Sequence, residues 1–295
     1  MIPIRAAYDQ LPESTRRLIR SILPEGILRW YANKNTDVYL FSYPKCGRTW
    51  LRLMIGRILI KHFELPDDEE ILILRWKKSP HPNIPKISVV HEDRPMLKSP
   101  DMLEKSKIHY QNKKVIFLVR DPRDVIVSNY FEQSKRITIF GTSGHQTQPT
   151  TFDGNLSAFI NQEIGGFDTI LTYYNIWAAN RNVPKGFHLV RYEDMKSDTH
   201  RVLRKILDFL ELCNISDETI DEAVSFASFE NMRRMEIGGE FKARMMKPAD
   251  TTDNESYKTR RGEVGGYNNY LSHAEIRSLS DKIRNNLDEY FGYKA

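Results

Sequence analysis

Cysteine is scarce in this sequence: only Cys46 and Cys213 occur among its 295 residues. Two cysteines do not suggest a disulfide framework, and neither belongs to a CxxC motif or a cluster of metal ligands, so we expect no metal site. No apolar run approaches the ~20 residues that a membrane-spanning helix needs. The opening residues, MIPIRAAYDQLPES, also lack the apolar core of a signal peptide. These absences favour a soluble, cytoplasmic protein with no membrane partner.

A strong excess of one charge is also missing. The sequence has 44 Lys and Arg against 39 Asp and Glu, which gives a net charge of +5. Such a small and dispersed excess suits anionic ligands but does not predict a nucleic-acid partner. Hydrophobic residues make up 40% of the chain, enough for the core of one large domain. No repeat or linker marks a second domain, and the residues do not indicate an oligomeric state.

The stretch 43–50, YPKCGRTW, carries the strongest chemical signal. It lies between an apolar run over 38–41 and an amphipathic run over 51–59. This order predicts a strand over 37–42, a tight loop, and a helix that extends to about His62. The general phosphate-loop pattern G-x-x-x-x-G-K-[ST] is absent, so the loop is of another type and need not hold ATP with magnesium.

The composition of this loop suits an anion. Backbone N–H groups and a helix N-terminus converge in such a loop and favour negative charge. Lys45 adds a positive charge, Gly47 permits close approach of the backbone, and Thr49 supplies a hydroxyl group. The loop considered alone is explained about equally well as an ordinary turn with a surface lysine.

Three further apolar runs predict strands, and polar residues follow each of them. A run over 87–91 ends in His91, a run over 114–119 precedes Arg120, and a run over 187–190 follows later. Helical patterns separate the runs, which predicts an α/β fold with a phosphate-loop-like central parallel sheet flanked by helices, in a single domain. Ligands bind at the carboxyl ends of such strands, so we expect His91 and Arg120 near the loop.

A structural role is the alternative for both residues. A lone histidine is more often structural than catalytic, and Arg120 could form an ion pair with Asp121 or Asp124. Asp121 also suits the N-cap of a helix whose first residue is Pro122. The repeated order of strand, charge and helix favours a ligand role for Arg120.

Apolar residues at helical spacing predict further helices. These helices are expected within 10–30, 153–181, about 202–210, 216–227 and 273–290, with a short strand or buried turn over 71–74.

Two segments, 134–152 and 236–258, have little pattern and are candidate lids over a substrate. Four acidic residues in or near them could favour a cationic acceptor, although solvated loop charges are the better explanation of them: Glu132, Glu236, Glu240 and Asp253.

Three segments together resemble one family, the cytosolic-type sulfotransferases that use 3′-phosphoadenosine 5′-phosphosulfate (PAPS). The stretch 43–50 resembles the family's loop for the 5′-phosphosulfate. Residues 120–128, RDPRDVIVS, are similar to its segment for the 3′-phosphate, and residues 260–267, RRGEVGGY, resemble its glycine-rich C-terminal stretch. The likeness runs from about residue 37 to 290, which predicts a helical segment over 1–36 before a sulfotransferase domain over 37–295.

The resemblance implies a set of residues for PAPS and its product, 3′-phosphoadenosine 5′-phosphate (PAP). It places nucleotide binding at Lys45, Cys46, Gly47, Arg48, Thr49, Trp50, Arg120, Ser128, Tyr192, Ser228, Phe229, Arg260, Arg261 and Gly262. It also implies that Lys45 and His91 are catalytic, with His91 as the general base.

The sequence departs from the family pattern at four positions. The lysine that the family carries two residues before its histidine is Val89 here, and Arg48 stands in place of a threonine. Cys46 replaces a serine, and Tyr267 replaces a common tryptophan.

The resemblance implies transfer of a sulfonate group from PAPS to a small-molecule acceptor, through a hydroxyl or an amine or carbamate nitrogen, without a metal. A nucleotide kinase or another phosphate-loop NTPase is the alternative enzyme class. A non-catalytic module that binds anions is the alternative outside enzymes.

Overall fold

The computed structural model describes residues 33–76, 78–136, 152–242, 247–248 and 250–293. The helix predicted within 10–30 lies outside these residues, as do residues 137–151 of the lid candidate 134–152.

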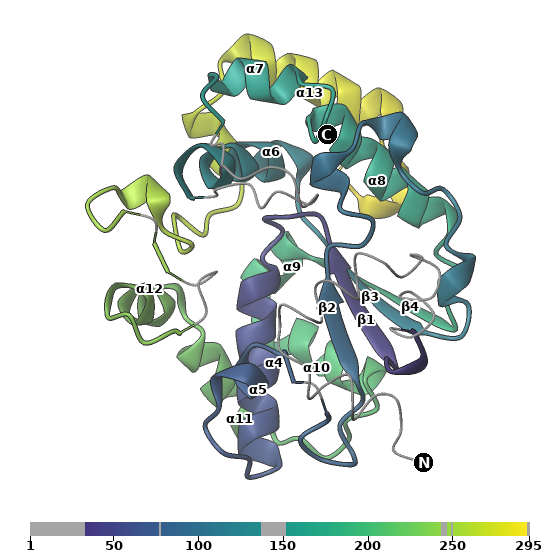
Figure 1. The fold of residues 1–295 in the computed structure, drawn as a ribbon, viewed down its shortest axis with the longest axis vertical. Coiled ribbons are helices and arrows are strands. Elements are labelled where there is room, and N and C mark those ends of the chain that lie inside the picture. The colour runs from purple at the N-terminus through teal and green to yellow at the C-terminus, as the bar shows by residue number, and fades with distance from the viewer. Residues whose placement is uncertain (1–32, 77, 137–151, 243–246, 249, 294–295) are drawn as a thin grey trace, which may run out of the picture.

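A parallel sheet of four strands lies at the centre of the molecule, in the order β2–β1–β3–β4 (Figure 1). The strands are β1 (Val38–Ser42), β2 (Ile87–Val90), β3 (Lys114–Val119) and β4 (Gly186–Arg191). The two central strands, β1 and β3, are almost wholly buried, as their continuous apolar runs predict. The predicted fold class is therefore confirmed.

Helices connect and flank the strands. They are α4 (Arg48–His62), α5 (Glu69–Leu72), α6 (Pro122–Phe131), α7 (Leu156–Asn161), α8 (Phe167–Ala179), α9 (Tyr192–Ser197), α10 (Thr199–Phe209), α11 (Asp217–Phe226), α12 (Phe229–Ile237) and α13 (His273–Asn286). A π-helical segment, Glu132–Arg136, continues α6. Short 3₁₀ turns occur at Pro95–Leu97, Pro100–Met102, Ile108–Tyr110, Asn254–Ser256, Gly266–Asn269 and Glu289–Phe291.

Two sequence predictions of local structure need correction. The segment 71–74 is neither a strand nor only a turn, because Asp68 caps the one-turn helix α5 and starts it earlier. The last helix, α13, ends at Asn286 rather than 290. By contrast, the helical signals within 153–181 correspond to two helices, α7 and α8, and α7 ends where Gln162 takes an extended backbone with a ψ of 146°.

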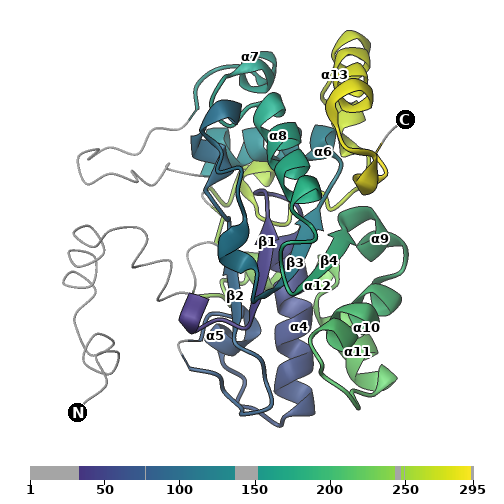
Figure 2. The ribbon, with the colours of Figure 1, turned by 90° about the vertical axis from the view of Figure 1, so that its right-hand side faces the viewer.

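Aromatic packing holds α8 against one face of the sheet. The ring of Trp177 lies 5.2 Å from that of Phe41 on β1 and 5.6 Å from that of Phe117 on β3. Figures 1 and 2 show α6, α8 and α13 grouped toward one end of the molecule and α4, α10 and α11 toward the other. At the start of α6, Asp121 caps the helix by accepting a hydrogen bond from the Arg123 N–H at 2.9 Å, and Pro122 follows it, as predicted.

Candidate active site

A cavity of about 300 Å³ lies where the strands end and the helices begin. Lys45 reaches it from the loop after β1, His91 from the end of β2, Arg120 from the end of β3, and Tyr192 from the end of β4. The chain moves from β1 to β2 on one side and to β3 on the other, so the cavity lies at the switch point where α/β sheets bind ligands.

Most residues that the resemblance singled out line this cavity. They are Lys45, Gly47, Arg48, Thr49, Trp50, His91, Arg120, Ser128, Tyr192, Phe229, Arg260, Arg261 and Gly262. Cys46 and Ser228 are not among its lining residues. The Cys46 thiol is buried 3.3 Å from the Tyr174 hydroxyl, and burial raises its pKa to about 12. The Ser228 hydroxyl caps α12 by accepting a hydrogen bond from the Asn231 N–H at 3.3 Å.

The backbone of the loop is shaped for close approach. Lys45 and Gly47 both adopt positive φ, at +73° and +92°. Such turns direct successive N–H groups into a concavity that suits an anion. A Cβ atom added to Gly47 would lie 2.6 Å from the Tyr192 ring, so the loop and this ring fit together only with glycine.

Lys45 points to a carboxylate at the end of α6. It forms a buried ion pair with Glu132, which also pairs with Lys258 at 3.2 Å and Arg136 at 3.4 Å. Burial alone would raise the pKa of the Glu132 carboxyl, but Lys258, Lys45 and Arg136 together lower it well below its usual range. Burial lowers the pKa of Lys45 to about 7, although Glu132 favours its charged form. An anion in the cavity would therefore increase the charge on Lys45.

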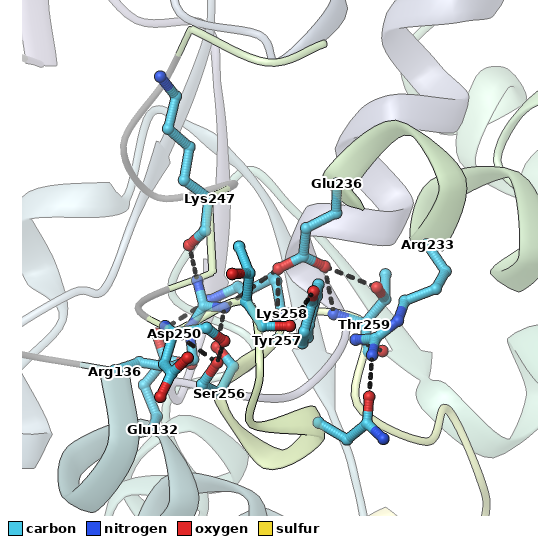
Figure 3. A network of polar contacts seen from close by, with 12 residues as sticks. Glu132, Arg136, Arg233, Glu236, Lys247, Asp250, Ser256, Tyr257, Lys258 and Thr259 are labelled. Carbon is cyan, nitrogen blue, oxygen red and sulfur yellow. Dashed lines mark hydrogen bonds and ion pairs between the residues drawn. The ribbon is translucent and has the colours of Figure 1, made fainter. Parts of the chain in front are cut away.

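A second carboxylate fixes the chain segment that leads to Arg260 (Figure 3). Glu236 on α12 is 3% exposed and accepts hydrogen bonds from the Lys258 N–H at 2.6 Å and the Thr259 N–H at 2.9 Å. It also accepts one from the Thr259 hydroxyl at 2.6 Å and one from Arg136 at 3.2 Å. This network joins α12, the extension of α6 and the C-terminal segment into one wall of the cavity.

These contacts correct one prediction about acidic residues. Glu132 and Glu236 are not solvated loop charges, because both are buried and surrounded by donors. They are therefore already satisfied and do not present free negative charge to a cationic acceptor.

His91 has the hydrogen bonds expected of a neutral base. Its Nδ1 lies 2.9 Å from the Ser42 carbonyl oxygen, which can only accept, so Nδ1 carries the proton. Its Nε2 lies 2.7 Å from Nη2 of Arg48, which donates to it. Burial first, and then Arg48, lower the pKa of His91 well below its usual 6.5. The imidazole is therefore neutral near pH 7, and its basic nitrogen Nε2 accepts from Arg48, which also lines the cavity.

Arg120 forms the ion pair that was the alternative to a ligand role, and it also faces the cavity. Its partner in the ion pair is Asp124, at 3.2 Å. The Nη2 of Arg120 donates a hydrogen bond to the Glu263 carbonyl at 2.7 Å, and its guanidinium lies 4.4 Å from the centre of the Tyr192 ring. Its buried Nε has no hydrogen-bond partner among the described residues. Asp124 in turn accepts hydrogen bonds from the Gly265 N–H at 2.9 Å and the Tyr267 N–H at 3.0 Å. The second and third motif segments are thus joined side by side.

Several lining residues are outside the predicted nucleotide-binding and catalytic set, and the important ones are Asp124, Glu132 and Lys258. The sequence indicates Asp124 only as a possible partner of Arg120, and Glu132 only as a charge that could favour a cationic acceptor. One signal could have found the first two. Asp124, Ser128 and Glu132 recur at every fourth residue, so they share one face of α6 and its extension. Lys258 has no such signal, because it lies in a segment without periodicity.

Comparison with known proteins identifies the family. The sulfotransferase domain model matches residues 35–291. Cytosolic sulfotransferase 12 of Arabidopsis thaliana is 27% identical, over 97% of this chain and 91% of its own length. Flavonol 3-sulfotransferase of Flaveria bidentis is also 27% identical, over 87% of this chain and 82% of its own.

A solved structure supports the same fold. The crystal structure of mouse sulfotransferase SULT7A1 complexed with PAP superposes with a TM-score of 0.55 at 22% identity, covering 88% of both chains. The chain therefore belongs to the sulfotransferase family, and the predicted enzyme class, a PAPS-dependent sulfotransferase, is confirmed. Within the described part of the chain, no helix combines the length and the apolar character needed to cross a membrane.

Proposed function

We propose that this enzyme transfers the sulfonate of PAPS to a hydroxyl or nitrogen of a small uncharged or anionic acceptor, with His91 as general base and Lys45 at the leaving phosphate. The observation that carries the proposal is the convergence of Lys45, His91 and Arg120 from three neighbouring strand ends on one cavity. Solved relatives of the same fold are complexes with PAP, which supports PAPS as the co-substrate and PAP as the product.

The residues present fit such a nucleotide. Gly47 lets the backbone of the loop lie directly against the Tyr192 ring at the edge of the cavity, and the buried Nε of Arg120 has no hydrogen-bond partner among the described residues. Arg120 and Arg260 can form charge-assisted hydrogen bonds with a 3′-phosphate, which ATP lacks. Trp50 and Tyr192, whose rings lie 5.8 Å apart, provide apolar surface on which an adenine base can rest.

The chain's own groups then define the chemistry. PAPS, when bound, supplies an activated sulfonate whose bond to the 5′-phosphate oxygen breaks as the acceptor atom bonds to sulfur. Lys45 and the loop N–H groups are placed to stabilise the charge that develops on that phosphate, and donors of this type contribute roughly 3–4 kcal/mol each. Nε2 of His91 takes the proton of the acceptor, a step that suits a neutral imidazole.

The acceptor is proposed only by class. The relatives include a flavonol 3-sulfotransferase, and structural neighbours include retinol dehydratase with androsterone or retinol bound. Because Glu132 and Glu236 are already paired, a cationic acceptor is disfavoured. A screen with radiolabelled PAPS across phenols, aliphatic alcohols, amines and carbamates would identify the acceptor class.

The lysine substitution Lys45→Ala tests the assignment of the loop. We expect turnover to fall by about 10²–10³-fold, while Lys61→Ala, an exposed lysine at the far end of α4, leaves it unchanged. Parallel thermal-shift titrations of the wild-type protein should show stabilisation by PAP and little by ATP. Normal turnover in the Lys45 variant, or stronger stabilisation by ATP, would contradict the proposal.

A further inference from the structure

Arg48 occupies an unusual position at the first residue of α4. One terminal nitrogen, Nη2, lies 2.7 Å from Nε2 of His91. The other, Nη1, is buried and has no hydrogen-bond partner among the described residues. Both nitrogens belong to a side chain that lines the cavity, so a donor-only group faces the space beside the base.

Five other cations that line the cavity have carboxylate partners, while Lys196, which also lines it, is exposed to solvent. Lys45 and Lys258 pair with Glu132, Arg120 with Asp124, and Arg260 and Arg261 with Glu255.

Arg48 differs from these cations, since no carboxylate in the described part of the chain lies within ion-pair distance of it. A buried cation without a counter-ion is costly, and burial accordingly lowers the pKa of Arg48 to about 10. The site is therefore one that an anion would complete.

The edge strand β2 supplies no positive charge beside His91, whereas α4 supplies Arg48. Val89 belongs to β2, and His91 directly follows the last residue of that strand, Val90. Val89 packs against the hydrophobic core and supplies no charge. The family pattern has a lysine at this position, and this chain has none.

We propose that Arg48 is a catalytic residue that binds the transferring sulfonate and takes the place of the lysine missing at position 89. This inference rests on the proposed function. In the transfer, the acceptor oxygen or nitrogen bonds to sulfur, the electron pair of the broken S–O bond goes to the 5′-phosphate, and the acceptor proton goes to Nε2 of His91. Arg48 donates two hydrogen bonds to sulfonate oxygens and releases Nε2 to the acceptor. The resemblance instead implied a contact between Arg48 and the 5′-phosphate, and the two roles predict different binding behaviour.

The decisive variant is Arg48→Gln, which removes the charge and keeps only a shorter, neutral donor. We expect its kcat to fall by about 10²-fold or more, while its calorimetric affinity for PAP, which has no sulfonate, stays within about threefold of wild type. In the ligand-free protein, NMR titration of labelled histidine should show the pKa of His91 rising toward its usual value. Arg57→Gln, an arginine on the same helix that pairs with Glu222 outside the cavity, is the matched control and should change none of these.

A residue exchange tests the replacement itself. Arg48→Thr combined with Val89→Lys recreates the family pattern, and it should have at least tenfold higher kcat than Arg48→Thr alone. Arg48→Lys, which keeps the charge without changing β2, should likewise exceed Arg48→Gln.

Three results would overturn the inference: a loss of PAP affinity in Arg48→Gln as large as its loss of kcat, an unchanged kcat, or an unchanged His91 pKa. It would also be overturned if the kcat of the double variant did not exceed that of Arg48→Thr and the kcat of Arg48→Lys did not exceed that of Arg48→Gln. A wild-type protein that neither binds PAP nor transfers sulfonate would instead refute the proposed function, so the two failures are distinguishable.

Discussion

Replacing Gly47 with alanine tests how the phosphate loop is built. The new Cβ would lie 2.6 Å from Cδ2 and 3.0 Å from Cε2 of the Tyr192 ring, at a backbone φ of +92°. The left-handed backbone costs a non-glycine residue roughly 1–2 kcal/mol, and overpacking against a buried ring costs about 1–3 kcal/mol more. The guanidinium of Arg120 lies 4.4 Å from the centre of the Tyr192 ring. A displaced ring should therefore also shift Arg120 and weaken PAP binding.

Gly239→Ala is the matched control for this experiment. Gly239 has a φ of +65°, and a Cβ added there would meet no atom within 4 Å. Urea unfolding should therefore show a loss of only about 1–2 kcal/mol for Gly239→Ala and about 2–5 kcal/mol for Gly47→Ala. Calorimetry should show weaker PAP binding for Gly47→Ala alone. Equal stability losses and unchanged PAP affinity in both variants would refute the packing argument.

Three further predictions concern the base, the 3′-phosphate arginine and the buried network. His91→Gln should lower kcat by about 10²–10⁴-fold with little change in PAP affinity, and equal losses of both would assign His91 a structural role. Because burial and Arg48 lower the pKa of His91, a pH–rate profile of the wild-type enzyme should show kcat/KM staying level as pH falls through 6.5 and declining only below that. Arg120→Lys keeps the charge beside Asp124 but loses the guanidinium fork, so PAP affinity should fall about tenfold by calorimetry, and an unchanged value would remove Arg120 from the 3′-phosphate site. Glu236→Gln should lower the free energy of unfolding in urea by about 1.5–3 kcal/mol and weaken PAP binding. The control Glu240→Gln, at an exposed ion pair with Arg234, should do neither. Equal effects of the two substitutions would show that the Glu236 network does not position the C-terminal segment.

The same neutral histidine makes stability depend on pH. His91 resists protonation in the folded protein but binds a proton in the unfolded chain below about pH 6.5. The unfolded state then binds more protons, so His91 contributes a loss of folding stability as pH falls from 6.5 toward its folded pKa. The contribution is limited to about 1.4 kcal/mol per pH unit.

Much of the sheet and the first motif could be predicted from local sequence. Strands β1 and β3 are continuous apolar runs, and the cap at Asp121 with Pro122 uses only neighbouring residues. The apolar spacing within 153–181 predicted helical structure there, but it did not predict the residue at which α7 ends, where Gln162 takes an extended backbone.

The sequence by itself determined the order of strand, loop and helix and the residue types at each strand end, because these depend on contacts a few residues apart. Only the tertiary structure decided which charges are satisfied. Glu132 meets Lys258 across 126 residues and Asp124 meets Gly265 across 141, and such pairings leave no periodic trace in the chain. The contact between Arg48, at the start of α4, and His91, after β2, also depends on the tertiary structure. It shows that the buried cation Arg48 contacts a neutral imidazole rather than a carboxylate.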